Sequence, residues 1–378
     1  MTNALLIYSR NTGGCLSSDI VKKIIGLSLI LILFAGIVWW KFSEHKYDEL
    51  EILEESTLDF GQLSSFFTKL AQSKGAAYAY EVLGRASLPP NTDMHLLGHV
   101  VGDELYKQKG IDGMSVCTQD FRNACSHSIV VGYFLAHGER GLADIADACR
   151  KAPGGSGAYM MCFHGLGHGI LAAVDYDLPR AVGLCQKTGN KESSQCVGGA
   201  VMEIISGGFH NKTQWEKQSK NYLSIINPLL PCTADYMPKS SRGQCLEYLT
   251  PRLVAAAGGS FEQGIPRDEV LKKAFSYCNE PACFAGFGKE FIVLVHNRDT
   301  RTLASMPDSE MRRVFALCAL AGSSGEVSCL THALDSLYWG GENDPKGAKR
   351  FCAIMESQEL KGSCEAHLAG AMEFFGHE

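Results

Sequence analysis

Two pairs of histidines have a spacing that suits metal binding. His95 and His99 stand four residues apart, as do His164 and His168, and both pairs share the pattern His-x-Leu-Gly-His. Histidines at positions i and i+4 lie on one face of an α-helix, and the neutral imidazole nitrogen is a ligand for Zn, Cu, Fe and Ni. The spacing therefore predicts that these pairs bind a divalent transition metal.

A fifth histidine occupies the matching place in a segment between the two pairs. His127 follows Cys125 by two residues, just as His164 follows Cys162. The later segments carry other residues at this place, so these histidines are a local feature and not a requirement of the fold. We predict that they converge on one side of a stack of helices, as one site between adjacent helices or as two weaker ones; the candidate ligands are His95, His99, His127, His164 and His168.

Two aspartates follow the histidines at helical spacing. Asp103 lies four residues after His99, and Asp175 lies seven residues after His168. A helix rises about 12 Å over eight residues, so Asp103 is too far along the helix to share one ion comfortably with both histidines of its pair. We predict instead that Asp103 and Asp175 accept a ring N–H from a ligating histidine. A site of two histidines and one carboxylate is the alternative.

Glycines surround the histidine pairs, and these glycines would allow close approach by a helix, a substrate or a flat cofactor. They are Gly98, Gly102, Gly165, Gly167 and Gly169. The chain has no Cys-x-x-Cys-His motif, which argues against a c-type haem, and a b-type haem between two histidines is the less favoured cofactor. Glu203 and Glu290 each follow a cysteine by seven residues, and we expect them on solvated helix faces.

The cysteines predict a disulfide framework. Cys15 precedes a long apolar run, and the other fourteen cysteines follow it as close pairs that recur along the chain. An even, dense set of cysteines downstream of an export signal is typical of an oxidising compartment. The expected disulfides are Cys117–Cys125, Cys149–Cys162, Cys185–Cys196, Cys232–Cys245, Cys278–Cys283, Cys318–Cys329 and Cys352–Cys364.

Each cysteine pair is embedded in the same arrangement of segments. A helical stretch such as LADIADAC ends at the first cysteine, a loop rich in Gly, Ser, Lys, Asn or Pro follows, and the second cysteine opens another helical stretch such as CVGGAVMEIIS. Strand signals are almost absent. The pattern predicts an all-α fold of helix hairpins, each closed by a disulfide, that stack into an α-solenoid because one hairpin cannot bury its own apolar face.

This arrangement resembles the cysteine-rich members of the Sel1-like and tetratricopeptide repeat superfamily over about residues 60–378. The resemblance lies in the architecture, since the Gly-x-Gly-Val pattern of Sel1 repeats is missing. It implies a solenoid with a binding face for a protein partner, and it implies no reaction and no role for any particular residue.

The N-terminal part predicts a membrane anchor. Residues 24–40, IIGLSLILILFAGIVWW, form an uncharged apolar run near the lower length limit for a bilayer span, and we favour a single-pass signal anchor over a cleaved signal peptide. Residues 1–23 are then a short cytoplasmic segment, and residues 41–58 are an acidic linker. Residues 59–378 are the repeat domain outside the cytoplasm.

Three functions remain open from the sequence. The first is a membrane-anchored protein that binds a transition metal, or a ligand containing one, through the histidine cluster. The second is a metal-dependent hydrolase or oxidoreductase that uses the same cluster. The third is a protein-interaction scaffold with structural histidines. The net charge of −6 and the absence of a basic motif argue against nucleic acid as a partner.

Overall fold

The computed structural model describes residues 48–54, 57–89, 92–208, 210–340 and 343–375. The chain divides into two compact units, Met1–Glu55 and Ser56–Glu378, and the first is described only at α2 (Asp48–Glu54). Every regular element in these ranges is helical, which confirms the predicted all-α class. The predicted anchor at residues 24–40 lies outside the described ranges, and none of the helices within them is long and apolar enough to cross a membrane.

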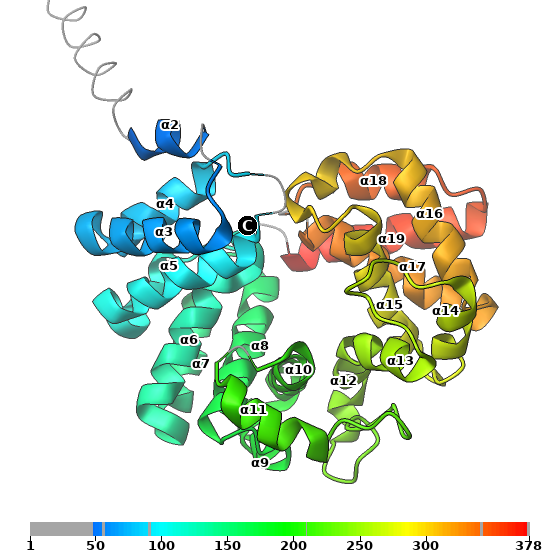
Figure 1. Ribbon diagram of the computed structural model, residues 1–378, viewed down its shortest axis with the longest axis horizontal. Coiled ribbons are helices and arrows are strands. Elements are labelled where there is room, and N and C mark those ends of the chain that lie inside the picture. Colours follow the sequence, from blue (N-terminus) through cyan, green and yellow to red (C-terminus); the bar gives the residue numbers. More distant parts are fainter. Residues whose placement is uncertain (1–47, 55–56, 90–91, 209, 341–342, 376–378) are drawn as a thin grey trace, which may run out of the picture. The chain divides into compact units, whose positions relative to one another are not determined.

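The second unit is built from one series of helices that pack side by side and a second series that flanks them (Figure 1). The helices that pack side by side through the unit are α5 (Met94–Lys109), α6 (Ala124–His137), α8 (Gly155–Ala173), α10 (Asn190–Ser206), α12 (Arg242–Tyr248), α15 (Pro281–Val295), α17 (Ser323–Gly340) and α19 (Gln358–Phe375). The helices that flank them are α3 (Phe60–Lys74), α4 (Ala76–Arg85), α7 (Leu142–Lys151), α9 (Leu178–Cys185), α11 (Lys212–Gln218), α13 (Thr250–Ala257), α14 (Asp268–Phe275), α16 (Asp308–Ala319) and α18 (Pro345–Ala353).

All seven predicted cysteine pairs are joined by disulfides, with Cα–Cα separations between 5.4 and 5.7 Å. The expectation that the second cysteine opens its helix is wrong for several hairpins. Helix α8 begins at Gly155, well before Cys162, and α10 begins at Asn190, well before Cys196. The reason is local, since Ala, Met, Glu and Gln in these loops favour helix once the chain has turned. The bridge therefore reaches the second helix one or two turns in.

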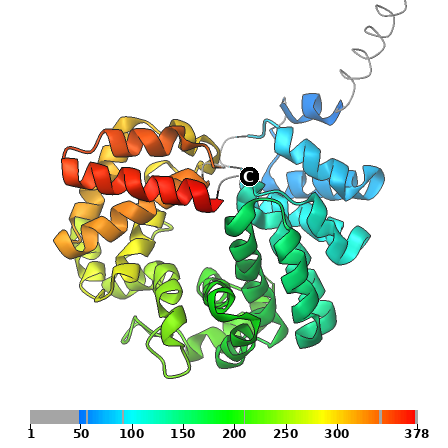
Figure 2. The same ribbon diagram turned by 180° about the vertical axis from the view of Figure 1, so that it is seen from behind.

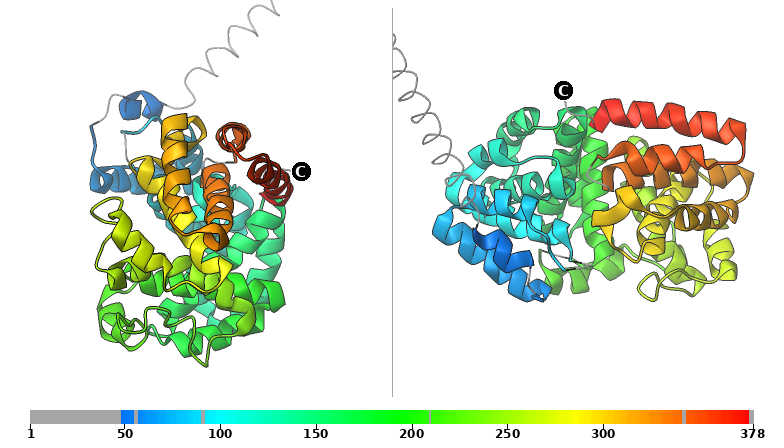
Figure 3. Two further views of the ribbon diagram at one scale, coloured as in Figure 1. Left: turned by 90° about the vertical axis from the view of Figure 1, so that its right-hand side faces the viewer. Right: turned by 90° about the horizontal axis from the view of Figure 1, so that it is seen from above.

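Six of the helices that pack side by side contact one another in a closed cycle. Helices α8, α10, α12, α15, α17 and α19 follow in contact order, and α19 returns to pack against α8. A side-chain atom added at Gly157 of α8 would overlap the Phe375 ring of α19. Figure 2, which views the molecule from behind, shows the end of α19 beside α8, and Figure 3 shows the same contact from two further directions. A stack with open ends would keep its first and last helices apart.

Hydrogen bonds between distant segments reinforce this closure. The Arg301 guanidinium donates to the Leu88 carbonyl at 2.6 Å, and the Asn343 side-chain amide donates to the Gln119 side-chain oxygen at 2.5 Å. Gln119 in turn donates to the Gly154 carbonyl at 2.7 Å. The C-terminal hairpins are therefore bonded to the N-terminal ones.

Glycines set how closely α8 and α10 pack. A Cβ at Gly199 would overlap the carbonyl oxygen of His164, and a Cβ at Gly167 would overlap that of Cys196. Backbone carbonyls have no flexible end to move aside, so Gly199→Ala should lower the free energy of unfolding by about 3 kcal/mol. A Cβ at Gly183, in contrast, meets no atom of the described structure within 4 Å, so the matched control Gly183→Ala should gain up to about 1 kcal/mol. Denaturant unfolding without reductant compares them, and equal stabilities would refute the close approach.

Candidate metal centre

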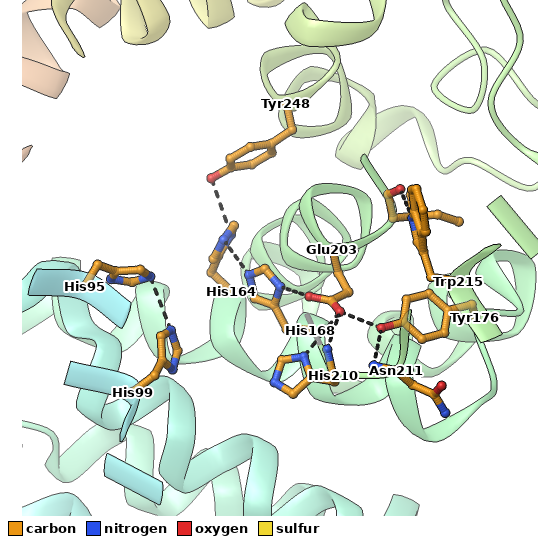
Figure 4. A network of polar contacts seen from close by, with 11 residues as sticks. His95, His99, His164, His168, Tyr176, Glu203, His210, Asn211, Trp215 and Tyr248 are labelled. Atoms are coloured by element: carbon orange, nitrogen blue, oxygen red, sulfur yellow. Dashed lines mark hydrogen bonds and ion pairs between the residues drawn. The ribbon is translucent and has the colours of Figure 1, made fainter. Parts of the chain in front are cut away.

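The five predicted histidines gather where α5, α6 and α8 lie side by side. Helix α5 carries the first pair, α8 carries the second pair, and α6 between them carries His127. The ring centroid of His127 lies 5.9 Å from that of His95, 5.8 Å from that of His99, 5.8 Å from that of His164 and 6.4 Å from that of His168. The structure therefore brings all five together, with two pairs flanking one central ring. Figure 4 shows the two pairs.

The ring of His95 is held by a turn of unusual conformation. Its Nδ1 lies 2.6 Å from the Phe121 carbonyl oxygen, and since a carbonyl only accepts, Nδ1 must carry the proton and donate it. Phe121, Arg122 and Asn123 all have positive φ angles of 52° to 63°, which costs each residue roughly 1–2 kcal/mol. This strained turn directs a carbonyl at His95 and leaves its Nε2 with a free lone pair.

His99 is oriented in the same way through a hydroxyl. Its Nδ1 lies 3.0 Å from Ser128 Oγ, and the single proton of that hydroxyl is used toward the His99 carbonyl at 3.1 Å or toward Asp103, which also hydrogen-bonds Ser128. In either arrangement Oγ accepts from His99 Nδ1–H, so Nε2 again holds a lone pair. The prediction for Asp103 needs a correction, because Asp103 acts on His99 through Ser128 and not on a ring directly.

The two Nε2 atoms of the first pair face each other at 3.2 Å. A tetrahedral ion with two imidazole nitrogens at about 2.05 Å holds them about 3.3 Å apart. Burial, together with the charge of Arg122, lowers the pKa of His95 to about 4, and burial places the pKa of His99 well below its ordinary value. Both rings are therefore neutral at physiological pH, as ligands must be.

His127 is the histidine of the cluster whose ring makes no hydrogen bond with the described residues. The ring is only 2% exposed, and neither of its nitrogens has a hydrogen-bond partner among the described residues. An unpaired buried polar group costs roughly 1–3 kcal/mol. Together with His95 and His99 it forms a group whose ligand atoms all lie within 4.8 Å of one another, and this group could hold a metal ion.

The second pair repeats the geometry of the first. His164 Nε2 and His168 Nε2 lie 3.3 Å apart, and each ring is contacted at its Nδ1 by another residue. His168 Nδ1 donates to Glu203 at 3.0 Å, and His164 Nδ1 lies 3.4 Å from the Tyr248 hydroxyl. Figure 4 shows these contacts on the two outer sides of the pair.

Glu203 is a fully buried carboxylate that four donors approach. The Tyr176 hydroxyl donates to it at 2.7 Å, the His210 backbone N–H at 3.2 Å, and the rings of His168 and His210 contact it at 3.0 and 3.3 Å. Burial alone would raise the pKa of Glu203, but the hydrogen bonds from the two histidines outweigh it and hold the pKa well below its ordinary value. A negative charge therefore sits beside the second pair.

Two acidic residues lie elsewhere than the sequence suggested. Glu203 was expected on a solvated face and is 0% exposed, because the segment after α10 folds back and covers it with His210. Asp175 was expected to hold a ring N–H and is instead exposed, in a turn after α8 with φ of 55°. Glu203, instead of Asp175, accepts the hydrogen bond from His168 Nδ1. The sequence analysis did not identify His210, Tyr176 or Tyr248, because these residues have no regular spacing to the histidine pairs. The one signal in the sequence was that Glu203 and Glu290 both follow a cysteine by seven residues.

The glycines beside the histidines admit helices and not a cofactor. A Cβ at Gly98 would lie 2.8 Å from the Ala124 Cβ, one at Gly102 would lie 2.8 Å from the Ser128 Cβ, and one at Gly169 would lie 3.0 Å from the Val131 Cα. Gly165 faces His127 in the same manner, and Gly167 faces α10. Residues of α6 and α10 occupy the space beside these glycines. The histidine rings therefore lie close together, and the described residues leave no space beside the glycines for a flat haem.

A cavity of about 500 Å³ lies within the cycle of six helices and is lined by residues from each of them. Tyr248 links it to the histidine cluster, since the ring lines the cavity and the hydroxyl lies 3.4 Å from His164 Nδ1. Lys289 Nζ lies 4.1 Å from the centroid of the Tyr248 ring, a cation–π contact. Polar side chains such as Glu247 and apolar ones such as Trp339 share the wall.

His332 in this wall predicts a pH-dependent stability. Its Nδ1 donates to the Ser328 carbonyl at 3.2 Å, and its Nε2 lies 3.5 Å from Glu247. Burial opposes a charge on the ring, but the hydrogen bond to Glu247 outweighs it and raises the pKa of His332 above its ordinary value. The other charged groups facing the ring are Asp335 on the same helix and Lys289 on α15.

A raised pKa means that the His332 contribution is complete below about pH 6.5 and is lost as the pH rises through the raised value. We expect the free energy of unfolding to fall over that range, and His332→Gln to flatten the fall. Urea unfolding from about pH 6 to pH 9 measures both proteins. An unchanged slope in the variant would show that another group is responsible.

No known family matches the chain, and no curated protein or solved structure resembles it closely enough to count as a match.

Proposed function

We propose that this protein binds a divalent transition metal ion through His95, His99 and His127. The observation that carries the proposal is the buried His127 ring, whose two nitrogens have no hydrogen-bond partner among the described residues. A bound ion would form a coordination bond with a nitrogen of that ring, and this bond would offset the free-energy cost of burying the nitrogen without a partner. The paired Nε2 atoms of the other two histidines, at 3.2 Å, support the same conclusion.

The ligand set favours borderline metals. Three neutral imidazoles with no thiolate and no directly bound carboxylate suit Zn²⁺, Cu²⁺ or Ni²⁺, and His₃ sets keep one position open for water or another ligand. The carbonyl of Phe121 and the hydroxyl of Ser128 fix the ring orientations before an ion arrives. Such contacts typically contribute 10- to 100-fold to affinity, so a site of this kind selects its ion by prepared geometry.

The proposed location is outside the cytoplasm. Seven disulfides in one chain support an oxidising compartment. In this proposal residues 24–40 anchor the chain in a membrane, and the disulfide-closed hairpins form a solenoid-like domain whose last helix has closed onto α8. Protease protection of the full chain in intact membranes tests the orientation.

Metal analysis of the full chain, purified without a histidine tag and dialysed against Zn²⁺, tests the metal proposal. We expect bound zinc, and His95→Ala and His99→Ala should each lower the content by one ion per chain. The matched control is His137→Ala, because His137 lies on α6 outside the cluster, with its ring stacked on Tyr133. Equal zinc contents in His95→Ala and the native chain would refute the proposal.

A metal-dependent enzyme is the second candidate function. The cavity favours it, because its volume suits a small amphipathic molecule and Tyr248 connects its wall to His164. A hydrolase would use an ion-bound water at the open position, and an oxidoreductase would use Cu or Fe. Screening model esters, phosphoesters and oxidisable phenols tests this candidate. Turnover that survives chelation or the loss of His127 would rule it out.

A further inference from the structure

His127 offers two ring nitrogens, and a single ion would use only one of them. The ring lies between two histidine pairs that come from different helices, with centroid separations of 5.8–5.9 Å to the first pair and 5.8 and 6.4 Å to the second, so it lies somewhat closer to the first. Both nitrogens lack a partner in the described part of the chain. An ion bound to one nitrogen of His127 therefore leaves the other nitrogen without a partner among the described residues.

The second pair has the dimensions of an ion site. Its Nε2 atoms lie 3.3 Å apart, which is the spacing of two imidazole nitrogens on a tetrahedral ion. Glu203 and Tyr248 both contact the Nδ1 side of their histidine, so the Nε2 atoms face inward. This is the arrangement of the first pair, where Phe121 and Ser128 take the Nδ1 atoms.

Each histidine pair has a carboxylate that orients one of its rings. Glu203 is fully buried and accepts a hydrogen bond from His168 Nδ1 at 3.0 Å, and Asp103 hydrogen-bonds Ser128, which contacts His99 Nδ1. Glu203 thus contacts its ring directly, whereas Asp103 reaches its ring through one hydroxyl. A carboxylate that holds a ligating imidazole strengthens the ligand and offsets the charge of the ion.

From this geometry we infer that the cluster is a dinuclear centre, with a second divalent transition metal held by His164, His168 and the other nitrogen of His127. The inference rests on the proposed function. His127 would then bridge the two ions as imidazolate, with one ring nitrogen for each ion. A neutral imidazole carries one N–H, so binding of the second ion releases that proton to solvent, and no oxidant or reductant is needed.

The stoichiometry of the full, untagged chain tests the inference. We expect two Zn²⁺ or two Cu²⁺ per chain, falling to one in His164→Ala and His168→Ala, and to one in His95→Ala. The control His367→Ala, whose ring pairs with Asp335 on the far side of the cavity, should keep two. Far-ultraviolet circular dichroism verifies that each variant is folded.

Two measurements keep the test decisive if an alanine variant does not fold. Glu203→Gln should weaken the second ion about tenfold to a hundredfold and leave the first unchanged. In the chain loaded with Cu²⁺, an imidazolate bridge couples the two spins, so the integrated electron paramagnetic resonance signal should fall below that expected for two isolated ions.

The outcomes separate the two proposals. One ion per chain that His164→Ala and Glu203→Gln leave unchanged would overturn the dinuclear centre and keep the first site, since the second pair would then be a hydrogen-bonded pair. No bound ion at all would overturn the proposed function itself. Two ions with uncoupled Cu²⁺ spins would overturn the bridge.

Discussion

His127→Leu should stabilise the metal-free protein and destabilise the metal-loaded one relative to the native chain. Without metal the native ring is buried with two unpaired nitrogens, and leucine of similar volume removes that cost, which predicts a gain of about 1–3 kcal/mol. With free metal at about 1,000 times its dissociation constant, the native chain gains about 4.1 kcal/mol from binding, and the variant loses this gain. The order of stabilities therefore reverses between chelator and metal.

Denaturant unfolding of the full chain, with the disulfides intact, measures both conditions. The control is His137→Leu at the other end of α6, where the ring stacks on Tyr133 and lies outside the cluster, so its effect should be the same in chelator and in metal. A loss of stability for His127→Leu in chelator would show that the ring has a structural partner, and it would remove the observation on which the metal proposal stands.

Removing the Cys149–Cys162 disulfide should lower both stability and ion affinity. The bridge closes a segment with a sequence separation of 13 and ties α8 to α7 two residues before His164. By the loop-entropy account, replacing both cysteines by alanine costs about 3 kcal/mol. Because α8 is then held less firmly, the proposed second ion at His164 and His168 should bind about tenfold more weakly.

The Cys278–Cys283 bridge is the matched control for that variant. Its sequence separation is 5, and it lies at the start of α15, away from the histidines. Its double alanine variant should cost about 2 kcal/mol and leave ion affinity unchanged. Thermal unfolding and Zn²⁺ titration compare the two variants. Equal ion affinities would mean that packing against α6 and α10 alone positions the second pair.

Much of the fold is local in origin and follows from the sequence. The cysteine pairs are 5 to 13 residues apart, so a turn between two helices brings them together whatever the rest of the chain does. The i, i+4 histidine pairs are likewise set by one helical turn, and the pairs His95–His99 and His164–His168 hold regardless of where their helices begin. The sequence predicts the first residues of the helices less accurately, because part of a Gly-rich or Ser-rich loop, such as the one before Cys162, is itself helical.

The sequence by itself determined which cysteines pair, that the chain is helical, and which five histidines belong together. Only the tertiary structure decided that His127 lies between two pairs with both nitrogens unpaired among the described residues, that buried Glu203 and not Asp175 holds His168, and that α19 returns to α8 around a cavity. The physical reason is the distance along the chain over which each interaction acts. Helical periodicity and short disulfide loops act over a few residues, whereas the distances between α5, α6 and α8 depend on side-chain volumes and on glycines that meet only after the helices have packed.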